Sequence, residues 1–319
     1  MASGLPTSTL GRTGLAVTRL CYGAMELRGG ARGRDVPEPQ VAEVLHAVLD
    51  AGITFIDTSP DYGLSEERIG RHLAGRRSEF LLASKCGCLV GETAAAGAGS
   101  AGGPPAHLFT RENVIAGVEQ SLRRMRTNYL DLVQFHGNPT RAQLEEHGAL
   151  AALLELREQG KVRFVGASST EPQLSELRAL GVFDAFQIPY SALQREHETS
   201  ISVAAADGAG TVIRGGAARG APSAEKGWAA RIIGMQEGVP QALWEAAALD
   251  ELKGEMSRME FTLRFTLSHP DLHTTIVGTT SVEHLRDNVR AAEAGPLPAE
   301  LYAEAKRRLA EAGSAPLPA

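Results

Sequence analysis

Residues 55–63 read Phe55-Ile56-Asp57-Thr58-Ser59-Pro60-Asp61-Tyr62-Gly63 and join an apolar run to a polar turn that carries an acid and a phenol. Residues 53–56 are mostly apolar, as in a strand that is covered on both faces, and Pro60 helps to end the run. A helix is predicted to begin within residues 63–67. Asp57 and Tyr62 are therefore expected at the carboxyl end of a buried parallel strand.

Two later strands end in the same way. The strand predicted at residues 80–84 is followed by Lys85, and the strand predicted at residues 129–135 is followed by His136. The carboxyl ends of parallel strands meet at one end of a sheet, where ligand sites of parallel α/β folds lie. The pattern therefore predicts that Asp57, Tyr62, Lys85 and His136 face one site.

The whole chain alternates between strand and helix patterns. Strands are predicted at 19–22, 53–56, 80–84, 129–135, 162–169, 183–189, 210–214 and 274–278. Helices are predicted at 40–51, 66–73, 111–126, 149–159, 171–180, 282–292 and 300–312. Eight strands close a (β/α)8 TIM barrel, an α/β fold in which residues 1–319 form a single domain. Residues 7–18 are expected to form an N-terminal β-hairpin that closes one end of the barrel. A doubly wound sheet fits less well.

Composition excludes several classes of protein. The chain has 319 residues, a formal net charge of -6 and 43% hydrophobic residues, without the basic stripe that nucleic acid requires. Residues 1–6 lack the features of a secretory signal and no apolar segment reaches the ~20 residues of a membrane span, so a cytoplasmic protein is expected. Cys21, Cys86 and Cys88 are interpreted as buried thiols, and no metal site is predicted.

The stretch 57–63, Lys85 after its strand, and Asp131-Leu132-Val133-Gln134-Phe135-His136 resemble the aldo-keto reductase family. The resemblance extends from the residues around Gly11 and Gly14 to Asn288, which is nearly the whole chain. It implies an enzyme that uses NAD(P)H to reduce an aldehyde or ketone, a small carbonyl compound, to an alcohol.

Four residues carry the chemistry in this hypothesis. Tyr62 is the general acid, Lys85 lowers its pKa, Asp57 fixes and partly neutralises Lys85, and His136 orients the carbonyl. A cation ~4 Å from a phenolate stabilises it by up to ~4 kcal/mol at an effective dielectric of ~20. Tyr62 would then titrate closer to neutral pH than its ordinary pKa of ~10.

Other polar residues are assigned plainer roles. Asp61 is interpreted as a turn residue, and His107 as a surface or loop histidine. The acid pairs Glu66-Glu67 and Glu145-Glu146 are interpreted as solvated helix faces.

The resemblance also implies a cofactor site. The nicotinamide would lie over a floor at residues 23–25 and against the ends of the fifth and sixth strands. The pyrophosphate would lie at residues 215–219, and the adenosine end at the turn and helix that follow the last strand. The residues implied are Gly23, Ala24, Met25, Ser168, Ser169, Gln187, Arg214, Gly215, Gly216, Ala217, Arg219, Gly278, Thr279, Thr280, Ser281, His284 and Asn288. An early GxGxxG is absent, which disfavours a Rossmann dehydrogenase.

The chain departs from the family pattern at three places. Ser169 stands where asparagine is usual, and Arg214 where many relatives have an aromatic residue that stacks on the nicotinamide. Thr280 and His284 stand where relatives selective for the phosphorylated cofactor carry Arg or Lys. Hydroxyls, the start of the last helix and His284 would still hold the 2′-phosphate, so NADPH is favoured. Without a fixed charge the preference over NADH is expected to be weak.

Two other functions are left open. A cofactor-binding regulatory or sensor protein of the same fold would bind NADPH without appreciable turnover, and a barrel isomerase or hydrolase would act without nicotinamide. The loops at 86–110 and 217–241 would line the substrate pocket, and their sequences do not identify the substrate. Oligomeric state is equally open.

Overall fold

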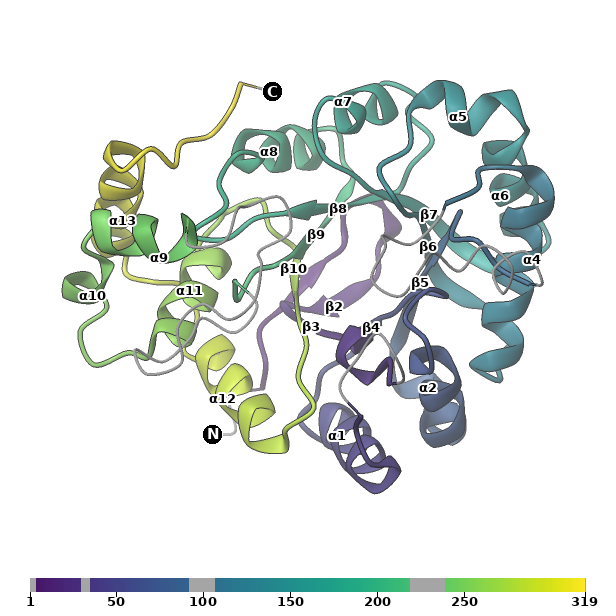
Figure 1. Ribbon diagram of the computed structural model, residues 1–319, viewed down its shortest axis with the longest axis horizontal. Helices are drawn as coiled ribbons and strands as arrows, with labels where there is room; N and C mark the ends of the chain where they lie inside the picture. Colours follow the sequence, from purple (N-terminus) through teal and green to yellow (C-terminus); the bar gives the residue numbers. More distant parts are fainter. Residues whose placement is uncertain (1–3, 30–34, 92–106, 219–238, 319) are drawn as a thin grey trace.

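The computed structural model describes residues 4–29, 35–91, 107–218 and 239–318. Eight parallel strands form a closed barrel in the order β10-β3-β4-β5-β6-β7-β8-β9, as Figure 1 shows. The strands are β3 (Leu20–Gly23), β4 (Phe55–Asp57), β5 (Leu81–Cys86), β6 (Leu130–Phe135), β7 (Val162–Ser168), β8 (Ala185–Pro189), β9 (Gly210–Arg214) and β10 (Thr274–Val277). Each overlaps a segment predicted to be a strand, so the predicted (β/α)8 barrel is confirmed.

Helices surround the barrel (Figure 1). They are α1 (Glu38–Asp50), α2 (Ser65–Leu73), α4 (Arg111–Arg124), α5 (Arg141–Glu146), α6 (Ala149–Glu158), α7 (Gln173–Arg178), α8 (Glu198–Ala206), α9 (Val239–Ala246), α10 (Leu249–Leu252), α11 (Arg258–Leu267), α12 (Val282–Glu293) and α13 (Ala299–Glu311). The sequence did not predict α8 or α11. None of these described helices is long and apolar enough to cross a membrane.

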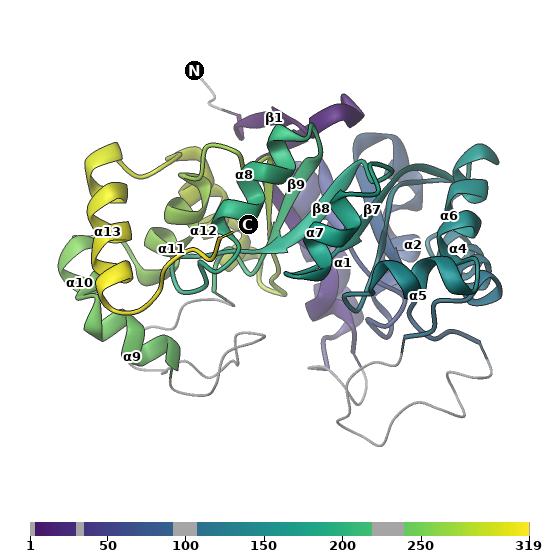
Figure 2. The ribbon, with the colours of Figure 1, turned by 90° about the horizontal axis from the view of Figure 1, so that it is seen from above.

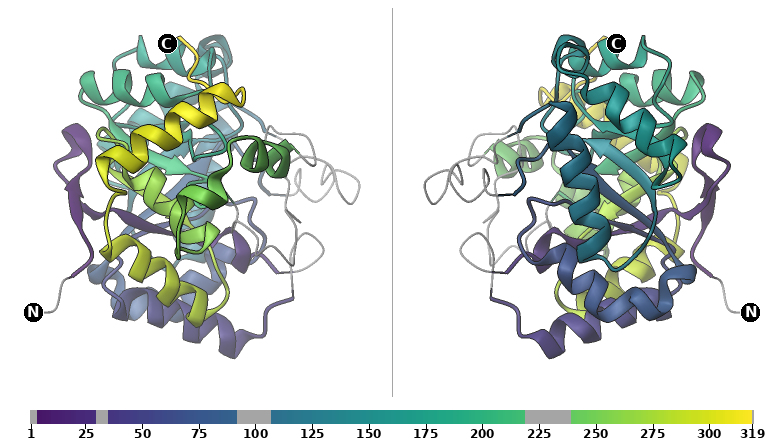
Figure 3. Two further views of the ribbon diagram at one scale, coloured as in Figure 1. Left: turned by 90° about the vertical axis from the view of Figure 1, so that its left-hand side faces the viewer. Right: turned by 90° about the vertical axis from the view of Figure 1, so that its right-hand side faces the viewer.

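An antiparallel hairpin of β1 (Thr7–Thr9) and β2 (Ala16–Thr18) lies at the amino-terminal end of the barrel, as predicted. Figures 2 and 3 show it, in purple, at one end of the molecule. The backbone N–H of Arg12 donates to the carbonyl of Gly208 over 2.7 Å, and the side chain of Leu10 is fully buried in the barrel interior. The hairpin therefore closes the end opposite to the strands' carboxyl ends.

The interior of the barrel changes from apolar to polar along its axis. Side chains of a strand alternate between the interior and the surrounding helices. Near the amino ends the interior holds an apolar cluster, composed of Leu10, Val17, Cys21, Phe55, Ala83, Leu132, Ala185 and Val212. Two residues further along their strands, Asp57, Lys85, Gln134 and Gln187 are all buried. This polar layer is the floor of the candidate site.

Glu66 corrects one prediction. Its side chain is fully buried rather than on a solvated face, and it accepts hydrogen bonds from the hydroxyls of Ser84 and Ser121 at 2.8 and 2.6 Å. Arg124 forms an ion pair with it at 3.4 Å. Glu66 thus joins α2, β5 and α4 behind the barrel wall. The three cysteines are buried free thiols, as predicted.

Candidate active site

Asp57 and Lys85 form a buried ion pair inside the barrel. Lys85 Nζ donates to Asp57 Oδ1 over 2.5 Å and to the carbonyl of Thr58 over 3.0 Å, and the lysine is fully buried. The side-chain amides of Gln134 and Gln187 also donate to Asp57 Oδ1, each over 3.1 Å. A buried ion pair is stable only where such hydrogen bonds replace lost hydration. Strands β4, β5, β6 and β8 therefore meet at one carboxylate.

Tyr62 lies in the turn that follows β4. Its backbone N–H donates to the carbonyl of Ser59, and Gly63 turns the chain with a φ of 50°. A Cβ at Gly63 would lie 2.5 Å from the carbonyl oxygen of Arg28, so only glycine fits there. The ring of Tyr62 meets that of His136 edge to face, with 6.2 Å between centroids. The structure therefore places Tyr62 at the same end of the barrel as the other three predicted catalytic residues.

The predicted pKa of Tyr62 is wrong for the protein without cofactor. Burial raises its pKa above the ordinary value, and the charges of Asp57 and Asp61 raise it further. The charge of Arg214 opposes this rise. Lys85 donates to Asp57 and Thr58, and within the described part of the chain no hydrogen bond joins it to Tyr62. Asp57 offsets the charge of Lys85 more fully than the sequence suggested.

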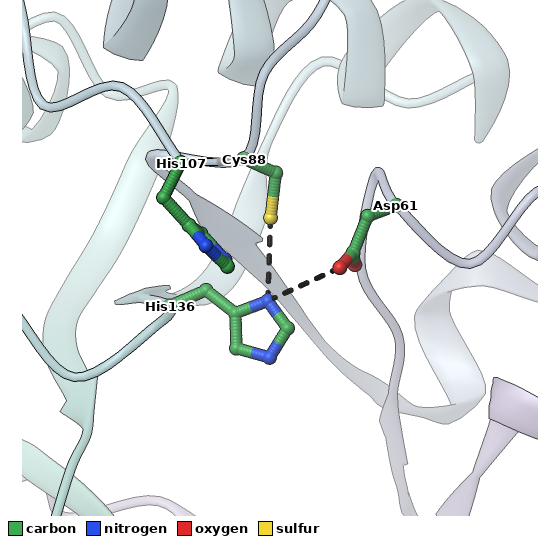
Figure 4. Close-up of side chains that lie close together, drawn as sticks. All are labelled: Asp61, Cys88, His107 and His136. Carbon is green, nitrogen blue, oxygen red and sulfur yellow. Dashed lines mark hydrogen bonds and ion pairs between the residues drawn. The ribbon is translucent and has the colours of Figure 1, made fainter. Parts of the chain in front are cut away.

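His136 follows β6, and its backbone N–H donates to the carbonyl of Cys86. Its Nδ1 lies 3.3 Å from Cys88 Sγ and 3.6 Å from Asp61 Oδ2, as Figure 4 shows. Burial, opposed by Asp61, lowers the pKa of His136 to about 4. The imidazole is therefore neutral at neutral pH and carries one N–H, which suits a group that orients a carbonyl oxygen.

Three residues at this site were not identified as site residues from the sequence. Asp61, interpreted as a turn residue, and His107, interpreted as a surface or loop residue, both face His136 together with Cys88 (Figure 4). His107 comes from a segment just before α4, and an isolated bridge pairs it with Cys88. The available signal for Cys88 in the sequence was the Cys86-Gly87-Cys88 stretch at the end of β5. In the structure Cys86 packs outside the barrel interior, and Cys88 lies at the mouth of the barrel.

The residues predicted to hold the nicotinamide are close to the ion pair. Ser168 Oγ donates to Gln187 Oε1 over 3.2 Å, and Gln187 in turn donates to Asp57. Ser169, which replaces the usual asparagine, donates to Asn138 Oδ1 over 2.6 Å. Asn138 was not predicted from the sequence. Its side-chain amide lies beside Ser169, the position at which asparagine was expected.

Among the residues that the structure describes, the other predicted cofactor residues follow β3, β9 and β10 or lie on α12. A Cβ at Gly216 would lie 2.0 Å from Thr275 Oγ1, and one at Gly278 would lie 2.7 Å from the carbonyl oxygen of Gly23. Small residues are therefore required there. Ser281 caps α12 by accepting from the N–H of His284, and Asn288 is buried on the same helix. Arg219 and most of the loops 86–110 and 217–241 lie outside the described residues.

Comparisons with known proteins agree with this geometry. The sequence profile described as "Aldo/keto reductase family" matches residues 19–309. The chain is 26% identical to the "Uncharacterized oxidoreductase YqkF" of Bacillus subtilis (strain 168) over 311 residues, which cover 91% of this chain and 92% of that protein. The holo form of "aldo-keto reductase AKR11C1" from Bacillus halodurans superposes with a TM-score of 0.78 at 27% identity, covering 95% and 96% of the two chains.

Proposed function

This chain belongs to the aldo/keto reductase family, and on that premise we propose that it reduces an aldehyde or ketone to an alcohol with NAD(P)H, with Tyr62 as the proton donor. The observation that carries the proposal is the arrangement at the ends of β4, β5 and β6. The phenol of Tyr62 and the imidazole of His136 lie in contact beside the buried Lys85–Asp57 ion pair. These are a donor, an orienting group and a fixed charge at one barrel mouth.

The cofactor site fits a dinucleotide in its local chemistry. Gly215 and Gly216 leave backbone close to the end of β9 without side chains, which allows phosphate oxygens to approach N–H groups. The amino end of α12, capped by Ser281, attracts an anion through its free N–H groups and its dipole. Ser168 and Gln187 would hold the carboxamide. When bound, the nicotinamide supplies a hydride to the carbonyl carbon.

The side chains of the chain handle the carbonyl oxygen. The O–H bond of Tyr62 breaks and its proton passes to the oxygen as negative charge develops there. A raised pKa keeps the phenol protonated before the reaction. An alkoxide is far more basic than a phenolate, so the transfer remains favourable. The N–H of His136 positions the oxygen, and the charge of Arg214, which favours the ionised phenol, stabilises the phenolate that remains.

NADPH is the proposed cofactor, with NADH as the alternative. The 2′-phosphate would contact the hydroxyls and N–H groups at the start of α12, where Thr280 and the exposed His284 lie. None of these groups is a fixed cation. The preference for NADPH is therefore expected to be smaller than an Arg or Lys would give.

A sensor that binds NADPH without turnover is the second candidate, because the pKa of Tyr62 is raised in the cofactor-free protein. Measuring NADPH consumption with a panel of small aldehydes and ketones separates the two functions. Saturable consumption above the rate without protein supports the reductase. Stoichiometric NADPH binding with no consumption across the panel supports the sensor.

A further inference from the structure

Four side chains with metal-binding atoms meet at the mouth of the barrel. They are Asp61, Cys88, His107 and His136, and one ligand atom from each lies within 4.8 Å of the other three. Figure 4 shows Cys88 and Asp61 both directed at Nδ1 of His136, with the ring of His107 beside them. The four come from the segments after β4, β5 and β6 and from the segment before α4.

Two of the distances already match a tetrahedral metal site. Zinc bonds of ~2.3 Å to sulfur and ~2.0 Å to nitrogen or oxygen, at the tetrahedral angle, place S and N about 3.5 Å apart and N and O about 3.3 Å apart. The observed separations are 3.3 Å between Cys88 Sγ and His136 Nδ1 and 3.6 Å between His136 Nδ1 and Asp61 Oδ2. A pair at the 4.8 Å limit would have to close by about 1.3–1.5 Å.

The local backbone fixes these ligands before any ion arrives. The bridge between Cys88 and His107 is supported by the N–H of Leu108, which donates to the carbonyl of Gly87 over 2.8 Å. The ring of His107 lies over Gly137, where a Cβ would lie 2.6 Å from it. The rings of His107 and His136 stand at 84° with 5.2 Å between centroids. Such preorganisation lowers the cost of ordering side chains on binding.

Asp61 has one carboxylate oxygen that is available to bind a cation. The Ser59 hydroxyl donates to its Oδ1, while its buried Oδ2 accepts no hydrogen bond from any residue that the structure describes. The side chain of Asp61 is only 8% exposed. An Asp61 carboxylate and a Cys88 thiolate together balance the two charges of a divalent ion, so the occupied site has no net charge to bury.

A nucleophilic thiol is the competing interpretation of Cys88 beside a histidine, and the geometry disfavours it. In such a triad the acid contacts one ring nitrogen and the nucleophile the other. Here Asp61 and Cys88 both face Nδ1 of His136. One nitrogen cannot be held by the acid and also accept the thiol proton, whereas convergence on one point is what a metal ion requires.

We propose that Asp61, Cys88, His107 and His136 bind one Zn²⁺ ion, the thiol proton of Cys88 being released to solvent. One sulfur, two imidazole nitrogens and one carboxylate oxygen are the ligand set that suits zinc, whereas Mg²⁺ and Ca²⁺ prefer oxygen alone. An ion bound to Nδ1 of His136 would fix the imidazole as the tautomer that carries its hydrogen on Nε2. This inference concerns binding and does not depend on the proposed reductase activity.

Cobalt provides the test, because Co²⁺ in a site with a thiolate shows a sulfur-to-metal charge-transfer band and the intense visible bands of tetrahedral geometry. Tag-free, chelator-treated protein is titrated with Co²⁺ under nitrogen, and Zn²⁺ is then added to displace it. The account predicts both bands at one equivalent and their stoichiometric loss with Zn²⁺. Cys88→Ala should abolish the charge-transfer band and weaken Zn²⁺ binding at least ~100-fold.

Cys86→Ala is the matched control, because Cys86 is a buried thiol two residues away whose side chain packs in the core outside the barrel interior. It should retain both bands. Asp61→Asn provides a second variant in case Cys88→Ala does not fold, and circular dichroism checks each variant. The proposal is overturned if Cys88→Ala or Asp61→Asn keeps the wild-type Zn²⁺ affinity, or if the wild type gives only the weak spectrum of octahedral cobalt.

Discussion

Asp57 organises the polar layer at the scale of single residues. Its carboxylate accepts hydrogen bonds from one buried ammonium and two buried amides, so β5, β6 and β8 each contribute one donor to it. Lys85 and Asp57 were both predicted to be site residues. The predicted lowering of the Tyr62 pKa is absent because burial raises that pKa and the charges of Asp57 and Asp61 raise it further. Neither the burial nor the distances to these charges can be read from the sequence.

Removing Lys85 alone should be costly. In Lys85→Met the carboxylate of Asp57 remains buried with only amide donors, and we expect the free energy of unfolding to fall by about 3–5 kcal/mol. Urea denaturation measures this change. The double variant Asp57→Asn with Lys85→Met has no uncompensated charge and should be more stable than the single one. Equal stability of the two would contradict the account of the ion pair.

His136 gives a prediction about pH. Its pKa of about 4 lies below the ordinary value of ~6.5, so the imidazole stays neutral until the pH falls through about 4. The kcat/KM for carbonyl reduction should then show no titration near pH 6.5. At lower pH, proton uptake on the ring should reduce it. A step near pH 6.5 in the wild type that is absent from His136→Asn would refute the lowered pKa.

At the scale of elements, the strands were easier to predict than the helices. Buried apolar runs that end in polar residues identified β4, β5 and β6. Helix α8 was missed because its sequence, ETSISVAAA, has little apolar periodicity. Glu66 was misassigned because its charge suggested a solvated face. The hydroxyls that accommodate it come from Ser84 and Ser121, distant in sequence and brought together only by the fold.

The amino end of α12 can be tested with two matched caps. Ser281 caps α12 and Ser257 caps α11, each accepting from the backbone N–H three residues on. Replacing either with Ala should cost about 1 kcal/mol of unfolding free energy. Only Ser281→Ala should also raise the Kd for NADPH, because only α12 is proposed to bind the phosphate. Fluorescence titration measures this, and equal NADPH affinities in the two variants would remove α12 from the cofactor site.

At the scale of the whole molecule, the barrel separates stability from function along its axis. The hairpin and the apolar interior occupy the amino-terminal end, and the polar layer and the predicted site residues occupy the other. The barrel could be predicted because apolar runs that alternate with helix patterns, eight in number, close a (β/α)8 barrel, and the hairpin because Gly11 and Gly14 separate two short strand-like runs. The cluster around His136 could not, since His107 reaches it from a segment with no periodic pattern.

Leu10 tests this separation. Its side chain is fully buried in the barrel interior, so Leu10→Ala should lower the free energy of unfolding by about 3 kcal/mol through the cavity it leaves. Because the proposed site lies at the opposite end, KM for the carbonyl and Kd for NADPH should remain at wild-type values below the melting temperature. A several-fold change in either constant would show that the two ends are coupled.

The most direct test of the account is to measure both the turnover and the NADPH affinity of Tyr62→Phe and to compare them with those of the wild type. This change removes one hydroxyl from a partly buried ring that keeps its edge-to-face contact with His136. The account predicts that kcat for the best aldehyde of the panel falls by about 10²–10⁴, while the Kd for NADPH stays within a few-fold of the wild type. Turnover at the wild-type rate by the folded variant would contradict it.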